Sequence, residues 1–187
     1  MKNLFSQSIA VTSQIEAGKT PIIEGLRAQF SPFCRFVDGG MLWQYYAEVF
    51  KKKDPRNIDY QVDTLIHGFA QSNFTVVESN IANCWMTRSF SVLLRCNLRK
   101  RAEMYAERKN ITLYEAETSI KHREVLDRRF LRTYGARCVC QRPDYFDLVI
   151  DTGIISSDEI VTKICKSHEK WKEKNFHRIT DGVVAPS

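Results

Sequence analysis

The first residues with recognisable chemistry form one run near the amino terminus, Ser13-Gln14-Ile15-Glu16-Ala17-Gly18-Lys19-Thr20. The run follows an apolar segment that predicts a strand, and it opens a segment that predicts a helix. In that context, backbone N–H groups of a loop and the positive end of a helix dipole surround a phosphate group. We expect residues 13–20 to bind the phosphates of ATP, with Lys19 reaching the β- and γ-phosphates and the Thr20 hydroxyl binding Mg²⁺.

This run, the phosphate loop, matches the Walker A pattern G-x-x-x-x-G-K-[ST] except at its first position, which is Ser13. Glycine serves at that position because the chain needs an unusual backbone angle or a close approach. We expect serine to be tolerated at some energetic cost, because Gly18, Lys19 and Thr20 are intact. The alternative is a chance match at the start of a helix.

A second group of side chains suited to anions lies in residues 121–132. Its positive charges are Lys121, Arg123, Arg128, Arg129 and Arg132, and only Glu124 and Asp127 balance them. Charged helices usually carry mixed signs, so this excess favours an anionic partner. A solvated helix face is the alternative, but a phosphate loop in the same chain favours the functional interpretation.

To position these residues, the chain must alternate strands with helices. Apolar, β-prone runs predict strands at 8–12, 35–38, 74–78, 90–95 and 146–151, and periodic segments predict helices at 18–29, 41–52, 58–71, 98–109, 113–134 and 157–174. Several of these strands are continuous apolar runs, which is the pattern of a parallel sheet covered on both faces. Right-handed crossovers then give an α/β fold with a doubly wound sheet.

Bulk properties exclude several classes of protein. The 187 residues fit one domain, and 43% hydrophobic with 27% charged residues is typical of a soluble globular protein. No run approaches the roughly 20 apolar residues of a membrane helix, and the amino terminus lacks the apolar region of a signal peptide. We therefore expect a cytoplasmic protein without a membrane partner. The net charge of +6 suits either nucleotides or nucleic acid.

Beyond the phosphate loop, the chain resembles the cytidylate kinase-like branch of the nucleoside monophosphate kinases over roughly residues 9–166. The resemblance rests on an aspartate-x-glycine segment at 37–43 (VDGGMLW), a strand and helix at 90–108 with recurring arginines at Arg101 and Arg108, a lid-like run at 122–129 (HREVLDRR), and a last strand and helix at 145–152 (YFDLVIDT) and 157–164.

The resemblance implies a three-layer P-loop NTPase fold, with a five-stranded parallel sheet, helices on both faces and a helical lid. It implies one kinase domain over residues 1–187, with an acceptor-binding helical region at 38–73, a lid at 109–142 and a charged carboxyl-terminal extension at 167–187. The implied reaction moves the γ-phosphoryl group of ATP to CMP or dCMP, with Mg²⁺ as cofactor and nucleotides as partners. We expect a monomer.

The same resemblance implies roles for individual side chains. Charge on the transferring group would be stabilised by Lys19, Arg123, Arg128 and Arg129. The acceptor would be bound by Asp38, Gly40, Trp43, Gln44 and Asp127. Trp43 would stack on the base, although a core aromatic is an equally good interpretation of this residue.

Two segments depart from the family pattern. After the third predicted strand, Glu78-Ser79-Asn80 replaces an E-G-R-like run. Glu78 can still hold Mg²⁺ directly or through water, whereas Asn80 cannot supply the charge of the arginine. Near the acceptor helix, Trp43-Gln44 replaces an aromatic–arginine pair, so that a charged phosphate contact is lost.

Three other functions stay open. A deoxynucleoside kinase would need a carboxylate base for the sugar hydroxyl, which Asp38 or Glu78 could supply, but residues 147–152 fit the monophosphate kinases better. A nucleotide-binding pseudokinase that has lost catalysis would explain the departures named above. Nucleic-acid binding ranks last, because residues 121–132 hold a single aromatic residue, Phe130.

Overall fold

The computed structural model describes residues 7–49, 61–62, 64–66, 68, 74–79, 82, 86, 89–133 and 142–180 of the chain. In chain order the elements are β1 (Ile9–Ser13), α1 (Lys19–Phe30), β2 (Arg35–Asp38), α2 (Gly39–Val49), β3 (Thr75–Glu78), β4 (Phe90–Arg95), α5 (Leu98–Lys109), α6 (Leu113–Thr133), the 3-10 helix η1 (Pro143–Tyr145), β5 (Leu148–Asp151) and α7 (Ser157–Thr180). Strands and helices alternate as the apolar patterning predicts.

The strands form one five-stranded sheet in the order β2-β3-β1-β4-β5, and every neighbouring pair is parallel. β1 therefore lies at the centre, with the phosphate loop at its carboxyl end. Along the same edge, Asp38 of β2 is in register with Glu78 of β3. This topology confirms the expected α/β fold with a five-stranded parallel sheet.

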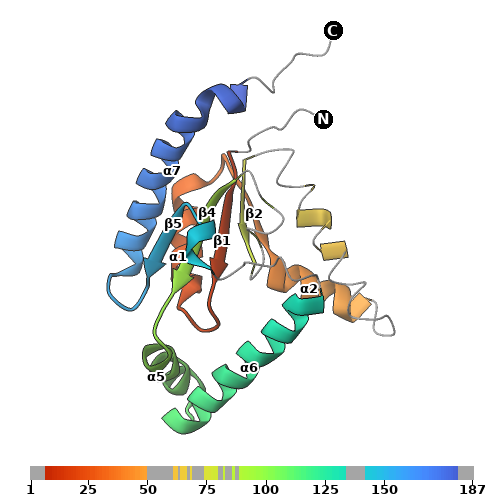
Figure 1. Ribbon diagram of the computed structural model, residues 1–187, viewed down its shortest axis with the longest axis vertical. Coiled ribbons are helices and arrows are strands. Elements are labelled where there is room, and N and C mark those ends of the chain that lie inside the picture. Colours follow the sequence, from red (N-terminus) through yellow and green to blue (C-terminus); the bar gives the residue numbers. More distant parts are fainter. Residues whose placement is uncertain are drawn as a thin grey trace.

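Helices cover both faces of the sheet because the strands are apolar on both sides. Ile9 and Val11 point to the face covered by α1 and α7, where Leu26 and Ile164 are fully buried. Ala10, between them in sequence, points to the opposite face, which α2 covers. These are the expected three layers, and Figure 1 shows α1 and α7 on one side of the sheet and α2 on the other.

α5 and α6 pack on each other rather than on a sheet face. Figure 1 shows them at the carboxyl edge of the strands, beside the phosphate loop. Their shared core consists of Ala102, Ala116 and Ile120, and it also takes in Ile15 from the phosphate loop. We refer to these two helices as the α5–α6 pair. Of the region predicted as a lid, residues 109–142, α6 is the described α-helix, whereas α5 ends where that region begins.

The predicted element boundaries differ from the structure in small ways. α2 begins at Gly39, two residues before the predicted start, because Asp38 caps it. α7 continues through the predicted carboxyl-terminal extension as one helix to Thr180. Its start is a capping box, in which Ser156 and Glu159 bond to each other's backbone N–H groups. The predicted helix at 58–71 lies partly outside the described residues, and residues 181–187 of the extension lie wholly outside them.

His168 fixes α7 to the rest of the domain. Its ring is fully buried, stacks on Phe74 with centroids 5.6 Å apart, and lies next to Trp171. Nε2–H donates to the backbone oxygen of Gln7 over 2.8 Å. Burial lowers the pKa of His168 to about 4, so the ring is neutral at physiological pH. Trp171, which lies in the predicted extension, packs against the hydrophobic core.

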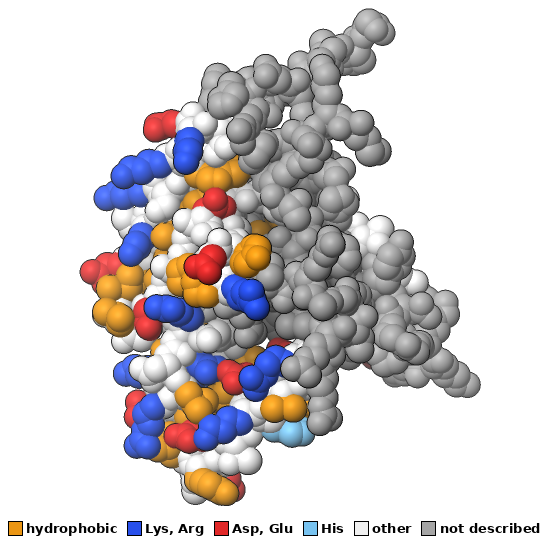
Figure 2. Space-filling model, in the orientation of Figure 1, with side chains coloured by type: hydrophobic (Ala, Val, Ile, Leu, Met, Phe, Trp, Pro, Cys, Tyr) orange, Lys and Arg blue, Asp and Glu red, His pale blue; other side chains and the backbone are white. Residues whose placement is uncertain are grey.

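The surface around α7 and the α5–α6 pair is mixed in charge. Figure 2 shows Lys and Arg side chains spread over the described part of this face, with Asp and Glu side chains between them. Among the described residues, no helix is both long and apolar enough to cross a membrane.

Candidate functional site

The phosphate loop joins the end of β1 to the start of α1. Ser13 is the last residue of β1, buried and in register with Leu94 of β4. Its φ is not positive, so this position does not use the backbone freedom of glycine, and the cost expected from a close approach stays a prediction. Positive φ values occur instead at Gly18, with φ 71°, and at Glu16, with φ 60°. Gly18 thus uses the freedom that glycine provides, whereas Glu16 adopts a left-handed conformation that L residues disfavour.

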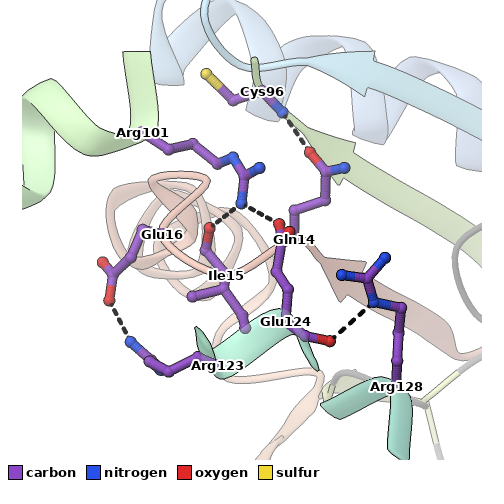
Figure 3. Close-up of polar contacts among 8 residues, drawn as sticks. All are labelled: Gln14, Ile15, Glu16, Cys96, Arg101, Arg123, Glu124 and Arg128. Atoms are coloured by element: carbon purple, nitrogen blue, oxygen red, sulfur yellow. Dashed lines mark hydrogen bonds and ion pairs between the residues drawn. The ribbon is translucent and has the colours of Figure 1, made fainter. Parts of the chain in front are cut away.

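Three side chains hold the backbone of the loop in place. Gln14 Oε1 accepts from the backbone N–H of Cys96 at 2.9 Å, Arg101 Nη1 donates to the backbone oxygen of Ile15 at 2.8 Å, and Thr152 Oγ1 donates to the backbone oxygen of Ala17 at 2.7 Å. Figure 3 shows the first two of these bonds. The three bonds join the loop to the β4–α5 junction, to α5 and to the segment after β5, so the loop is fixed to three parts of the domain.

Arg101 is the most deeply buried of the site's cations, with 5% of its side chain exposed. Besides the carbonyl of Ile15, its Nη1 contacts the Glu124 carboxylate at 2.8 Å (Figure 3). One guanidinium therefore joins the phosphate loop to both helices of the α5–α6 pair. A buried charge is stable only when it is paired and hydrogen-bonded in this way.

Glu16 lies at the tip of the phosphate loop and bridges to the same two helices. Its carboxylate accepts from Arg108 Nη2 of α5 at 2.5 Å and from Arg123 Nη1 of α6 at 2.8 Å. Only 13% of the Glu16 side chain is exposed, whereas both arginine side chains are about half exposed. Arg123 therefore lies beside the phosphate loop, with the loop's own carboxylate as its partner.

Lys19, the first residue of α1, forms an ion pair with Glu78 at the end of β3. Glu78 is buried and Thr20, next along α1, is exposed. Among the described residues, no three His, Cys, Asp or Glu side chains converge as a ready-made metal site. Thr20 and Glu78 are nevertheless hard oxygen donors of the kind that Mg²⁺ uses when phosphates and water complete its shell, so they fit this ion.

The predicted acceptor residues gather at the start of α2. The Asp38 carboxylate accepts from the backbone N–H of Met41 at 2.9 Å and so caps the helix. Gly40 and Gln44 are exposed, and a Cβ at Gly40 would lie 3.2 Å from Asp38 Oδ1. The side chain of Trp43 and the whole of Asn80 lie outside the described residues. Asp38 and Gly40 are thus brought to the sheet edge that holds Glu78.

The other predicted residues of α6 are further from the loop. Arg128 Nε donates to the backbone oxygen of Glu124 at 3.1 Å, within its own helix (Figure 3). Asp127 is partly buried, and this burial raises its pKa against the opposing effect of Arg123. The side chain of Arg129 is not described. Of the two α6 arginines predicted to be catalytic whose side chains are described, Arg123 contacts the phosphate loop and Arg128 contacts its own helix.

Sequence reasoning missed the contacts of Arg101, Arg108 and Thr152. Arg101 and Arg108 are seven residues apart, which places them on one face of α5 two turns from each other. That spacing was a usable signal for a common partner. A glutamate inside a loop that should bind anions was a second signal, because its charge needs a partner of opposite sign.

Comparisons with known proteins give a relative by sequence and solved structures that share the fold. The chain is 30% identical over 166 residues to the cytidylate kinase of Pyrobaculum aerophilum, a match that spans 82% of this chain and 88% of that protein. No family model matches the chain. Among solved structures, an uncharacterised protein from Eubacterium ventriosum covers 86% of this chain and is itself covered over 97%, with a TM-score of 0.69 and 13% identity. Shikimate kinase from Acinetobacter baumannii covers 91%, with 96% of its own length matched, at a TM-score of 0.59 and 15% identity.

Proposed function

This chain belongs to the cytidylate kinase family, and on that premise we propose that it transfers the γ-phosphoryl group of ATP to a nucleoside monophosphate, with CMP or dCMP as the acceptor. One observation carries the proposal: three cations from three different helices form ion pairs at the phosphate loop or beside it. They are Lys19 of α1, Arg108 of α5 and Arg123 of α6. Phosphoryl transfer needs this arrangement, because its catalysis consists mainly of positioning and charge neutralisation.

In the proposed mechanism, the triphosphate binds across the phosphate loop. Backbone N–H groups of the loop and the amino-terminal end of α1 hold the phosphates. Lys19 leaves Glu78 and contacts the β- and γ-phosphates, which carry more negative charge than a single carboxylate. The departure of Lys19 leaves the Glu78 carboxylate available for a cation.

Thr20 and Glu78 are the residues that would hold Mg²⁺, with Glu78 acting directly or through water. When bound, this ion supplies neutralisation and orientation of the donor phosphates. Thr20 stands at the first turn of α1, immediately after Lys19, so the two residues would act on neighbouring phosphate oxygens.

We assign the α5–α6 pair as the lid of the site. Arg123, together with Arg128 and Arg129 further along α6, would stabilise charge on the transferring group as the pair closes over it. Closure also excludes water and so limits hydrolysis of ATP. Asp127, whose pKa is raised by burial against the opposing charge of Arg123, would face the acceptor.

The acceptor would bind at the start of α2. β2 and β3 are adjacent, so Asp38 and Gly40 lie beside the sheet edge at which Glu78 and Lys19 meet. A monophosphate bound there would be next to the γ-phosphoryl group. Trp43 would stack on its base, and Gln44 would offer an amide in place of the charge that an arginine provides.

The test is ADP production from Mg·ATP with a panel of nucleosides and nucleoside monophosphates. The Lys19→Ala variant, purified in the same way, controls for a contaminating kinase. Turnover with CMP or dCMP supports the proposal, and turnover with an unphosphorylated nucleoside replaces it with a deoxynucleoside kinase. No turnover on any acceptor, with ATP binding retained, would identify a nucleotide-binding protein that does not transfer phosphate.

A further inference from the structure

The carboxylate of Glu16 is in an unexpected place for a residue of a phosphate-binding loop. Glu16 immediately precedes Ala17, in the stretch whose backbone N–H groups would face the phosphates of ATP. Its carboxylate carries the same sign of charge as those phosphates. The left-handed backbone at φ 60° is disfavoured for a residue with a side chain. A glycine would avoid both the strain and the charge.

Two guanidinium groups, from Arg108 and Arg123, offset the unfavourable charge and backbone conformation of Glu16. Arg108 and Arg123 reach its two carboxylate oxygens separately, Oε2 and Oε1, at 2.5 and 2.8 Å. The arginines come from different helices, and Glu16 is much less exposed than either of them. This is the way in which two arginines hold a phosphate group, with a carboxylate in its place.

The neighbouring ion pair follows the same pattern. Lys19 is bound to the Glu78 carboxylate. Each of the three cations Lys19, Arg108 and Arg123 is therefore paired with a carboxylate of the protein itself. The two acids differ in one respect. Glu78 lies at the end of a strand and can turn to a metal ion, whereas Glu16 is part of the loop and stays beside the bound phosphates.

We propose that Glu16 is an internal competitor of the donor phosphates. Its carboxylate takes the place of a phosphate group and holds the guanidinium groups of Arg108 and Arg123 at the phosphate loop. A nucleoside triphosphate binds by drawing both arginines away from Glu16. The inference rests on the proposed function, since it assigns a regulatory role within the same site.

The Glu16→Gln variant tests this competition, with Glu103→Gln as its matched control. Glu103 is also an acid paired with an arginine, Arg99 of α5 at 3.0 Å, but it lies on an exposed part of that helix. Calorimetric titration with Mg·ATP should show Glu16→Gln binding about fivefold to tenfold more tightly than the native protein, as expected for release of two partly exposed ion pairs. Glu103→Gln should match the native protein. Glu16→Gly should also bind more tightly, because it removes the same competing charge.

Hydrogen exchange without nucleotide gives a second readout. Amides of α6 near Arg123 should exchange faster in Glu16→Gln than in Glu103→Gln, because Arg123 has lost its charged partner on the loop. Unchanged or weaker ATP binding by Glu16→Gln would overturn the competitor role while leaving the proposed function intact. If neither the native protein nor Glu16→Gln binds a nucleoside triphosphate, the proposed function fails and the competition fails with it.

Discussion

Arg101 donates from Nη1 to the backbone carbonyl oxygen of Ile15, 2.8 Å away, so a buried charge on α5 fixes the middle of the phosphate loop. The same nitrogen contacts Glu124 of α6. Removal of Arg101 would leave the Ile15 carbonyl and the Glu124 carboxylate without this donor. Neither group is exposed enough for water to replace the lost hydrogen bond fully. The conformation of the loop thus depends on a residue far from it in sequence.

Replacing Arg101 with methionine should therefore destabilise the domain by about 2–3 kcal/mol, because it leaves the Glu124 carboxylate and a loop carbonyl unpaired. Urea unfolding measures this loss. Arg99→Met is the control, since Arg99 is exposed on the same helix and should cost less than about 0.5 kcal/mol. Equal stability of the two variants would show that the Arg101 contacts contribute little.

Lys19→Ala should abolish ATP-dependent turnover and weaken triphosphate binding strongly. The variant removes the cation that would contact the β- and γ-phosphates, and it leaves Glu78 as an unpaired negative charge beside them. Steady-state assays and calorimetry measure the two effects. Lys172→Ala, which breaks an ion pair with Glu169 on α7, should leave both unchanged. Native-like turnover by Lys19→Ala would remove the phosphate loop from the mechanism.

Arg123→Ala should lower kcat about 100-fold and change KM for ATP by less than about threefold, as expected for a group that acts on the transition state. Arg123 has to leave the Glu16 carboxylate before it can contact a phosphate, so ground-state ATP gains little from it. Initial rates over a range of ATP concentrations separate kcat from KM. A rise in KM with unchanged kcat would argue against the assigned lid role.

Stability should fall as the pH is lowered from about 6.5 to about 4, because His168 is neutral when folded and its pKa of about 4 lies below the ordinary value of 6.5. Over that range the unfolded chain binds a proton that the folded chain does not, which costs at most about 3 kcal/mol. Urea unfolding at several pH values measures the slope. In His168→Phe this component should be absent, and an identical slope would assign the pH dependence to carboxylates elsewhere.

Much of this architecture was predictable from local sequence. Continuous apolar strands such as 90–95 indicate a parallel sheet, and the serine and glutamate at the start of α7 indicate a capping box. The partners of Glu16 were not predictable in this way. Arg108 and Arg123 are 92 and 107 residues from it in sequence, and their meeting depends on how the α5–α6 pair packs. The buried His168 also gave no local signal, since its environment is made by strands and helices from across the chain.

Ile15 belongs both to the phosphate loop and to the core of the α5–α6 pair, and this limits which segments can be exchanged between this domain and its relatives. Its backbone belongs to the phosphate loop, while its side chain is buried among Ala102, Ala116 and Ile120. Helices grafted from another kinase would bring a cavity shaped for a different residue at that point. A chimaera with a related kinase therefore has to exchange two separate segments together, residues 13–20 and residues 98–133.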